Sequence, residues 1–239
     1  MITLICAMFL VTLVGSERPT EAERQTLLAF HNAKRRLVNP PAADMHELVY
    51  NRRLERLAYE WAERCSYTFP PPHFDQYDEN PVNIAYSDGL VRNVTAMANK
   101  WWNESYDFNY EKNVCEAPMC GYYLQMVWGN TEKIGCAVQR CEKVQRGPQT
   151  PCYLLTCAYT PPGRIINVIP YAKGESCSAC PNGTTCIDKL CSKRPAPPSS
   201  DITGGTGNTG DIDTTSTSSS IWVREMGTCF MLIVYLLVQ

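Results

Sequence analysis

Cysteine content constrains this chain more than any other feature of its sequence. Thirteen cysteines occur among 239 residues, and most of them lie in the second half of the chain. A reducing cytosol rarely hosts so many, whereas disulfide bonds form and persist in secreted proteins. We therefore predict a disulfide-bonded domain in an oxidising compartment.

Spacing alone does not decide which cysteines pair. Cys6 and Cys229 lie in the terminal segments, which leaves an odd number, so one thiol is free or pairs with another chain. The fate of Cys152 stays open. Ten cysteines are predicted to form disulfides: Cys65, Cys115, Cys120, Cys136, Cys141, Cys157, Cys177, Cys180, Cys186 and Cys191. Zinc is the alternative for the last four, and an oxidising compartment disfavours it.

The chain begins with an apolar run that has the length of a signal-peptide core. The segment MITLICAMFLVTLVGS ends in small residues that suit cleavage before Glu17, and charged residues follow at once. This pattern predicts a signal peptide over residues 1–16 and a secreted chain. The alternative is a buried N-terminal helix.

The other end of the chain is typical of a stalk followed by an anchor. Residues 193–220 are rich in Ser, Thr, Pro and Gly and predict a disordered segment. Residues 221–239 end in an apolar run shorter than the ~20 residues of a spanning helix. Small serines, a short spacer and this run resemble a glycosylphosphatidylinositol signal, so we expect tethering to the outer cell surface. A short tail anchor and a segment packed on the domain are the alternatives.

Apolar periodicity places helices first and strands afterwards. Thr20 and Glu23 form a capping box before a first helix, which Asn39-Pro40 ends. A second helix follows Asn51. The apolar stripes that we assign to the core are Leu27, Leu28, Phe30, Ala33 and Leu37 on the first helix, Leu54, Leu57, Ala58, Trp61 and Cys65 on the second, and Val94, Met97, Ala98 and Trp101 on a third. Residues 134–141 and 152–159 are typical of strands, which indicates an α+β domain over residues 20–171.

A short cysteine-rich segment follows that domain. Residues 172–192 hold four cysteines in a stretch too small for a hydrophobic core of its own. We predict a small disulfide-stapled hinge module there.

The charge balance limits the possible partners, and the sequons indicate sites of glycosylation. The net charge is −2, with 22 basic and 24 acidic side chains, which leaves no basic excess for nucleic acid or an anionic membrane surface. Asn93, Asn103 and Asn182 head N-x-[ST] sequons and are predicted glycosylation sites in a secreted chain.

Several ordered segments carry a resemblance to a known family. They are FHNAKRRLVNPPAADM, LAYEWAERC, DEN, WWNESYDF, CGYYLQMVWGNTEKIGCAVQRC and CAYTPPG. Together they resemble the CAP superfamily, the cysteine-rich secretory, antigen-five and pathogenesis-related proteins, over residues 20–191. CSACPNGTTCIDKLC is similar to the hinge of the glioma-pathogenesis-related and peptidase-inhibitor-16-like branch. The resemblance implies a three-layer α-β-α sandwich.

The resemblance also implies a cleft with two histidines and two glutamates that bind a divalent metal in several members. By motif, Glu79 and Glu104 are the glutamates, and Tyr122 stands at the second histidine position. Phe69 holds the first histidine position, or His73 substitutes for it. A phenol must lose its proton before it binds zinc well, so any site formed by His73, Glu79 and Glu104 is expected to be weak or absent.

The functional hypotheses follow from the presence of Tyr122 at the second histidine position. No nucleophile motif is present, so we do not expect an enzyme, and a metal-dependent protease ranks last because Tyr122 replaces a histidine. Family members bind sterols or fatty acids, and Tyr106, Phe108 and Tyr110 alternate in the corresponding region as candidates for a lipid-binding flap, with core packing the alternative. An extracellular protein-interaction or immunomodulatory scaffold is the alternative function.

Overall fold

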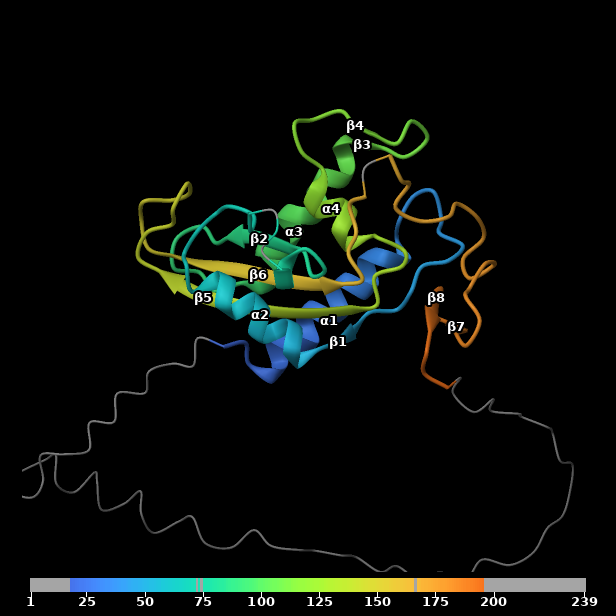
Figure 1. Ribbon diagram of the computed structural model, residues 1–239, viewed down its shortest axis with the longest axis horizontal. Helices are drawn as coiled ribbons and strands as arrows, with labels where there is room; N and C mark the ends of the chain where they lie inside the picture. Colours follow the sequence, from blue (N-terminus) through green and yellow to red (C-terminus); the bar gives the residue numbers. More distant parts are fainter. Residues whose placement is uncertain (1–17, 72, 74, 166, 196–239) are drawn as a thin grey trace, which may run out of the picture. The chain divides into compact units, whose positions relative to one another are not determined.

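The computed structural model describes residues 18–71, 73, 75–165 and 167–195 (Figure 1). The predicted signal peptide, the tail, and all of the stalk except residues 193–195 lie outside the described residues. None of the helices within the described ranges is long and apolar enough to cross a membrane.

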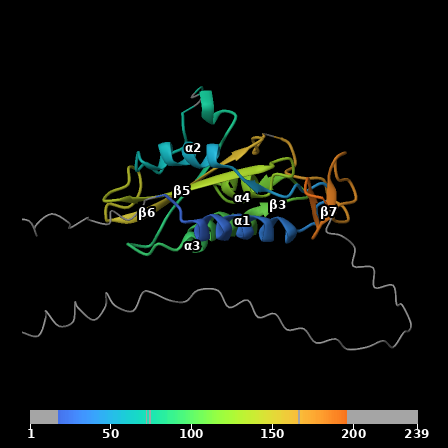
Figure 2. The same cartoon turned by 90° about the horizontal axis from the view of Figure 1, so that it is seen from below.

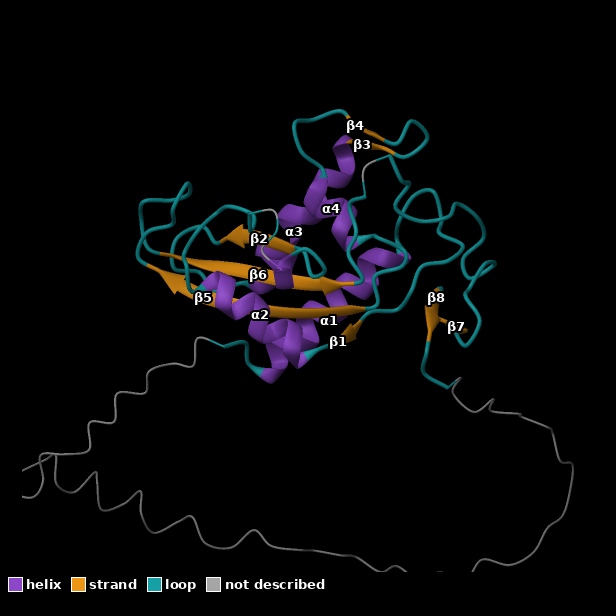
Figure 3. Ribbon diagram, in the orientation of Figure 1, coloured by secondary structure: helices purple, strands orange, loops and turns teal. Residues whose placement is uncertain are grey.

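The three predicted helices and the two predicted long strands are present. The helices are α1 (Glu21–Arg36), α2 (Arg52–Ala62), α3 (Val94–Asn103) and α4 (Gly121–Met126), with short 3-10 turns η1 (Asp75–Tyr77) and η2 (Glu104–Asp107). The strands are β1 (Val49–Tyr50), β2 (Val82–Tyr86), β3 (Phe108–Asn109), β4 (Val114–Cys115), β5 (Lys133–Cys141), β6 (Cys152–Thr160), β7 (Thr185–Ile187) and β8 (Leu190–Ser192). The predicted order was wrong, because β1 and β2 lie between the helices and a fourth helix, α4, was not predicted. Figure 3 shows the long strands at the centre and the helices around them.

The main sheet has the strand order β1-β5-β6-β2. The two longest strands, β5 and β6, pair antiparallel, with Cys136 opposite Cys157 and Cys141 opposite Cys152. Strand β2 pairs antiparallel with β6, and β1 pairs parallel with β5.

Helices cover both faces of this sheet. Figure 2 shows α2 on one side and α1 and α3 on the other. One buried cluster joins α2 to the sheet, and a second joins α1, α3 and α4 to the opposite face. Since both faces are covered, β5 and β6 are buried along most of their length instead of alternating. The predicted three-layer α-β-α sandwich is confirmed.

A glycine sets the distance between α2 and the sheet. A Cβ atom at Gly135 would lie 2.2 Å from the backbone nitrogen of Glu55 and 2.5 Å from the carbonyl oxygen of Asn51. The side chain of Asn51 caps α2 by accepting from the amides of Arg53 and Leu54. The first turn of α2 therefore packs directly on the backbone of β5.

The buried face of α1 differs from the apolar stripe predicted for it. Thr20 and Glu23 do form the capping box, but Ala33 is exposed and Leu37 is 65% exposed. The buried side chains are Leu27, His31, Asn32 and Arg35. Leu28 and Phe30 pack partly buried against the core, so the predicted stripe was wrong for Ala33 and Leu37, because α1 packs on main-chain carbonyls as well as on side chains.

Arg35 accounts for much of that polar contact. Its guanidinium donates to the carbonyl oxygens of His46, Met126, Trp128, Gly129 and Thr131, at 2.8 to 3.1 Å. The cation thereby satisfies carbonyls at the end of α4 and in the turn before β5. It fixes the position of α4, on which the candidate site depends.

Disulfide bonds pair the ten cysteines predicted to form them. In the sandwich they join Cys65 to Cys141, Cys115 to Cys120, and Cys136 to Cys157. In the hinge they join Cys177 to Cys186 and Cys180 to Cys191. Cys152 is buried and free.

The hinge is docked on the segment between α1 and β1. The amide of Cys191 donates to the carbonyl of Met45 at 2.8 Å, and its carbonyl accepts from the amide of Glu47 at 3.0 Å. The amide of Ala179 donates to the carbonyl of Ala43 at 3.0 Å. The short β7-β8 hairpin, drawn in orange in Figure 1, thus continues the folded unit.

Candidate ligand site at the start of α4

Glu104 lies immediately after α3 and reaches the first turn of α4. Its Oε2 accepts hydrogen bonds from the backbone amides of Tyr122 and Tyr123, each at 2.9 Å. The first amides of a helix have no partner within the helix, so the carboxylate caps α4. Burial raises the pKa of Glu104 and outweighs the opposing effect of the two amides.

Tyr122 is buried among aromatic rings. It is 6% exposed, and its ring centroid lies 5.3 Å from that of Phe69 and 6.4 Å from that of Trp101. Burial, followed by the influence of the Tyr67 phenol, raises the pKa of Tyr122 well above its ordinary value. The phenol therefore stays protonated at neutral pH.

Phe69 carries a cation on its ring. It is 40% exposed, and the guanidinium carbon of Arg164 lies 5.0 Å from its ring centroid. Arg164 follows Pro161-Pro162-Gly163 and has a left-handed backbone with φ of 61°. A Cβ atom at Gly121 would lie 3.5 Å from Cδ of Arg164, so the arginine stem crosses the first residue of α4.

The Arg164 guanidinium is half-buried and lacks a partner anion. Among the described residues it forms no hydrogen bond and no ion pair. Burial lowers its pKa, while the nearby Tyr159, Tyr122 and Glu104 act in the opposite direction. The sequence patterns did not single out Arg164, because its position over the ring of Phe69 results from a contact between segments far apart in the chain.

His73 and Glu79 take no part in this arrangement. Both side chains are exposed. Within the described ranges, neither forms a hydrogen bond or an ion pair with Glu104 or Tyr122. The structure thus sets Phe69 against Tyr122 and leaves His73 at the surface.

These residues do not fit a divalent metal. Phe69 offers no ligand atom, Tyr122 keeps its proton, and Arg164 brings a positive charge to the position next to both. In the part of the chain that is described, the single cluster with metal-ligand spacing is Cys177, Cys180 and Cys191. All of these sulfurs belong to disulfides and supply no thiolate.

The aromatics predicted to form a lipid-binding flap do not share one environment. Tyr106 is 84% exposed. Phe108 packs partly buried against the core, with its ring centroid 5.9 Å from that of Tyr123. Tyr110 donates from its hydroxyl to the carbonyl of Tyr171 at 2.6 Å. Only Tyr106 is thus free to cover a ligand, whereas Phe108 and Tyr110 hold the β3-β4 hairpin on the domain.

Exposed apolar side chains lie close in sequence to Glu104, Gly121 and Arg164. Tyr106 follows Glu104 by two residues, Met119 precedes Gly121 by two, and Ile165 follows Arg164 directly. Met119 is 47% exposed and Ile165 is 54% exposed. We call Phe69, Tyr106, Met119 and Ile165 the apolar rim. An apolar rim beside a cation is suited to binding and offers no nucleophile.

The sequon asparagines are all exposed. Asn93 caps α3 through its side-chain oxygen, which accepts from the amide of Ala96 at 3.0 Å. Asn103 accepts from Asn99 at 3.1 Å, while the neighbouring Glu104 turns to α4. The two adjacent side chains therefore point to different surroundings.

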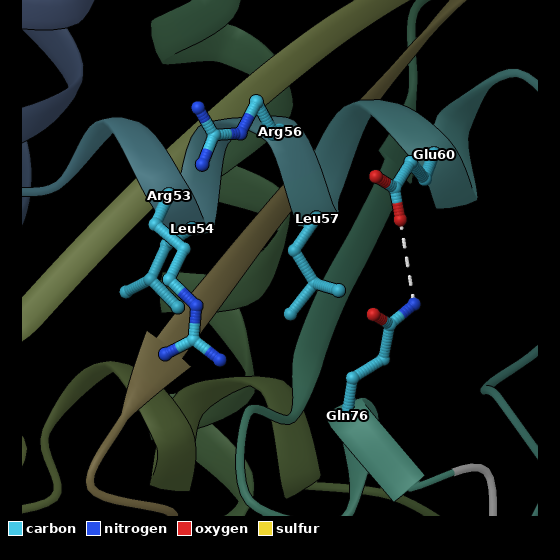
Figure 4. Close-up of a pocket in the computed structure, with 6 residues that line it drawn as sticks. All are labelled: Arg53, Leu54, Arg56, Leu57, Glu60 and Gln76. Carbon is cyan, nitrogen blue, oxygen red and sulfur yellow. Dashed lines mark hydrogen bonds between the residues drawn. The ribbon is translucent and has the colours of Figure 1, made fainter.

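A separate shallow pocket lies beside α2. Figure 4 shows the lining residues Arg53, Leu54, Arg56, Leu57 and Glu60 on that helix, with Glu60 facing Gln76 of η1. Nε2 of Gln76 donates to Oε2 of Glu60 at 3.3 Å. The pocket brings together no groups suited to catalysis.

Comparison with known proteins identifies the family to which this fold belongs. The model of the CAP family, the cysteine-rich secretory proteins, matches residues 28–159. GLIPR1-like protein 1 of Mus musculus is 37% identical over 182 residues, which cover 72% of this chain and 75% of that protein. The chain belongs to the CAP family.

Two further relatives differ in how much of them is matched. Peptidase inhibitor 16 of Mus musculus is 34% identical over 173 residues, which cover 72% of this chain but only 34% of that longer protein. The crystal structure of NaASP2 with Zn2+ superposes with a TM-score of 0.59 at 26% identity, over 74% of this chain and 98% of that one. The predicted family and branch are confirmed.

Proposed function

We propose that this chain is a non-catalytic extracellular binding protein whose ligand is a hydrophobic small molecule, a sterol or a fatty acid. The observation that carries the proposal is the apolar rim beside Arg164. Each apolar side chain covered by a ligand contributes on the order of 1 to 3 kcal/mol. Binding at the rim needs no metal and no ionised Tyr122.

The chemistry of the same residues supports a non-catalytic role. Glu104 uses its carboxylate to cap α4, and Tyr122 is a buried, protonated phenol. Neither is arranged to activate water or a nucleophile.

Lipid binding by the full chain tests this proposal. The protein is secreted from a eukaryotic host, lipids that co-purify are identified by mass spectrometry, and binding of radiolabelled cholesterol and palmitate is titrated. We expect saturable binding of at least one lipid. Met119→Ser with Tyr106→Ser should weaken it about tenfold through loss of apolar contact. Leu90→Ser with Val91→Ser, which alters exposed apolar side chains elsewhere, is the matched control.

Absence of saturable binding to both lipids would reject the proposal. Equal loss in the rim variant and in the Leu90/Val91 control would instead point to a non-specific effect on the surface. Thermal melts of both variants distinguish a folding defect from a loss of binding.

Binding of an extracellular protein is the second candidate function. Relatives named peptidase inhibitor 16 and peptidase inhibitor 15 support it. Adjacent exposed side chains, Leu90 at 54% and Val91 at 62%, lie in the loop before α3 and offer a contact surface. Inhibition of a panel of extracellular peptidases by the full chain, lost in the Leu90→Ser/Val91→Ser variant and kept in the rim variant, would favour this candidate.

Surface tethering and glycosylation complete the proposal. Residues 221–239 resemble a lipid-anchor signal, and the exposed Asn93, Asn103 and Asn182 lie in sequons. We expect phosphatidylinositol-specific phospholipase C to release the protein from cells and peptide N-glycosidase to reduce its mass. Retention on cells, with an intact peptide through Gln239, would reject the anchor.

A further inference from the structure

The unpaired cation of the site is its most unusual electrostatic feature. Among the described residues, Arg164 has no anion within ion-pair distance, although its guanidinium is half-buried. Removing a charge from water without a hydrogen-bonding partner costs free energy. The ring of Phe69 compensates only in part, since a cation over an aromatic face gains less than a charge paired with an anion.

The neighbours of Arg164 do not neutralise it. Glu104 interacts with Arg164 over a distance, but its Oε2 is engaged by the amides of Tyr122 and Tyr123. Tyr122 and Tyr159 are buried phenols that keep their protons. The five N–H donors of an arginine fork suit a carboxylate, which can accept two of them at once.

We propose that Arg164 binds the carboxylate of an amphipathic ligand whose apolar chain lies on the apolar rim. A long-chain fatty acid is the ligand class with this combination of groups. The inference rests on the proposed lipid-binding function and specifies it, because a sterol carries no carboxylate. In this chain the side-chain cation beside Phe69 thus anchors the charged end of the ligand.

Three probes, two of which share the same alkyl tail, test the inference on the full secreted chain. They are palmitate, hexadecanol, which has the same tail without the charge, and cholesterol. We expect palmitate to bind at least about tenfold more tightly than hexadecanol, as a charge-assisted bond predicts. Arg164→Gln should remove that advantage and leave hexadecanol affinity unchanged. Arg164→Lys should keep part of it, because a point charge replaces the fork.

Arg146→Gln is the control variant. Arg146 is an exposed loop arginine with a left-handed backbone, φ of 56°, so its replacement changes net charge and loop chemistry in the same way. Its palmitate affinity should equal that of the unmodified chain. Thermal melts verify that each variant is folded.

The outcomes separate this inference from the function on which it rests. Equal affinities for palmitate and hexadecanol, an Arg164→Gln variant that binds palmitate normally, or equal loss of both probes in that variant would each overturn the role of Arg164. In those cases lipid binding itself would stand. If the unmodified chain binds none of the three probes, the proposed function fails, and the inference fails with it.

Discussion

Glu104 accepts a hydrogen bond from the backbone amide of Tyr122, with 2.9 Å between Oε2 and the nitrogen. These residues hold two of the four cleft positions that the family resemblance implies. In this chain a helix cap joins them, and the side chain of Tyr122 turns to Phe69 and Trp101. The glutamate thus has a structural role here that can be measured apart from any ligand.

Glu104→Ala should destabilise the domain by about 2 kcal/mol, because two amide bonds to a charged acceptor are lost at the start of α4. Glu104→Gln should cost less, since an amide oxygen still accepts. Chemical denaturation measures both changes. Glu79→Ala, at an exposed position, is the control and should be neutral. Equal effects of the Glu104 and Glu79 substitutions to alanine would contradict the capping role.

Stability should fall as the pH drops from about 6.5 towards 4, because His31 resists protonation in the fold. His31 is 0% exposed, and burial lowers its pKa to about 4. Its Nδ1–H donates to the carbonyl of Leu27 at 2.7 Å, so its Nε2 accepts from the hydroxyl of Tyr159 at 3.0 Å. In the unfolded chain the imidazole takes up a proton in this window, which favours unfolding.

The expected loss from His31 is about 3 kcal/mol across that window. Denaturation of the unmodified chain and of His31→Gln at about pH 7 and about pH 4.5 isolates the contribution, since the carboxyl groups are common to both. An unchanged pH dependence in the variant would show that other groups account for acid sensitivity.

The thiol of Cys152 should be inaccessible to labelling reagents in the native protein. It is 1% exposed, and burial raises its pKa, which reduces the reactive thiolate. Labelling with a maleimide should be slow in the native protein and complete in denaturant without reductant. The Cys152→Ser variant should lack this slowly labelled thiol. Rapid labelling of Cys152 in the native protein would contradict its buried position.

Tyr122→His alone should not create a tight zinc site. The new imidazole would face Phe69, whose ring also contacts the positive charge of Arg164. The Phe69→His/Tyr122→His variant supplies two imidazoles near Glu104 and should gain at least about tenfold in zinc affinity. Adding Arg164→Gln should increase the gain. Calorimetry that shows equal zinc binding by the unmodified chain and the double variant would refute this account.

The sequence predicted the fold through local signals. The side chains of Thr20 and Asn51 cap α1 and α2 and so indicate where these helices begin. The prolines after Tyr159 indicate where β6 ends. These features act over a few residues, so a pattern can reveal them. Local patterns do not determine how the helices and strands stack in layers, and the family resemblance predicted that arrangement.

The site depended on contacts that no local pattern contains. Arg164 contacts Phe69, which lies far from it in the sequence, and the CAYTPPG motif that precedes it does not include Arg164. The polar face of α1 was missed for the same reason, because the carbonyls that receive Arg35 come from segments about a hundred residues away and from the nearby His46. The assignment of Phe69 or His73, with Glu79, Glu104 and Tyr122, as one cleft stays a prediction, and of these residues the structure brings Phe69, Glu104 and Tyr122 together.

The docked hinge also determines how the domain bears mechanical force. A pull on the chain beyond residue 195 enters the folded unit along β8, where the backbone of Cys191 is bonded to Met45 and Glu47. Those two bonds make up one parallel bridge between Cys191 and His46, so a pull along β8 loads them together. The Cys180–Cys191 disulfide shares the load covalently and limits how far the chain extends. Peeling the hinge from the domain would therefore require these backbone bonds to break together.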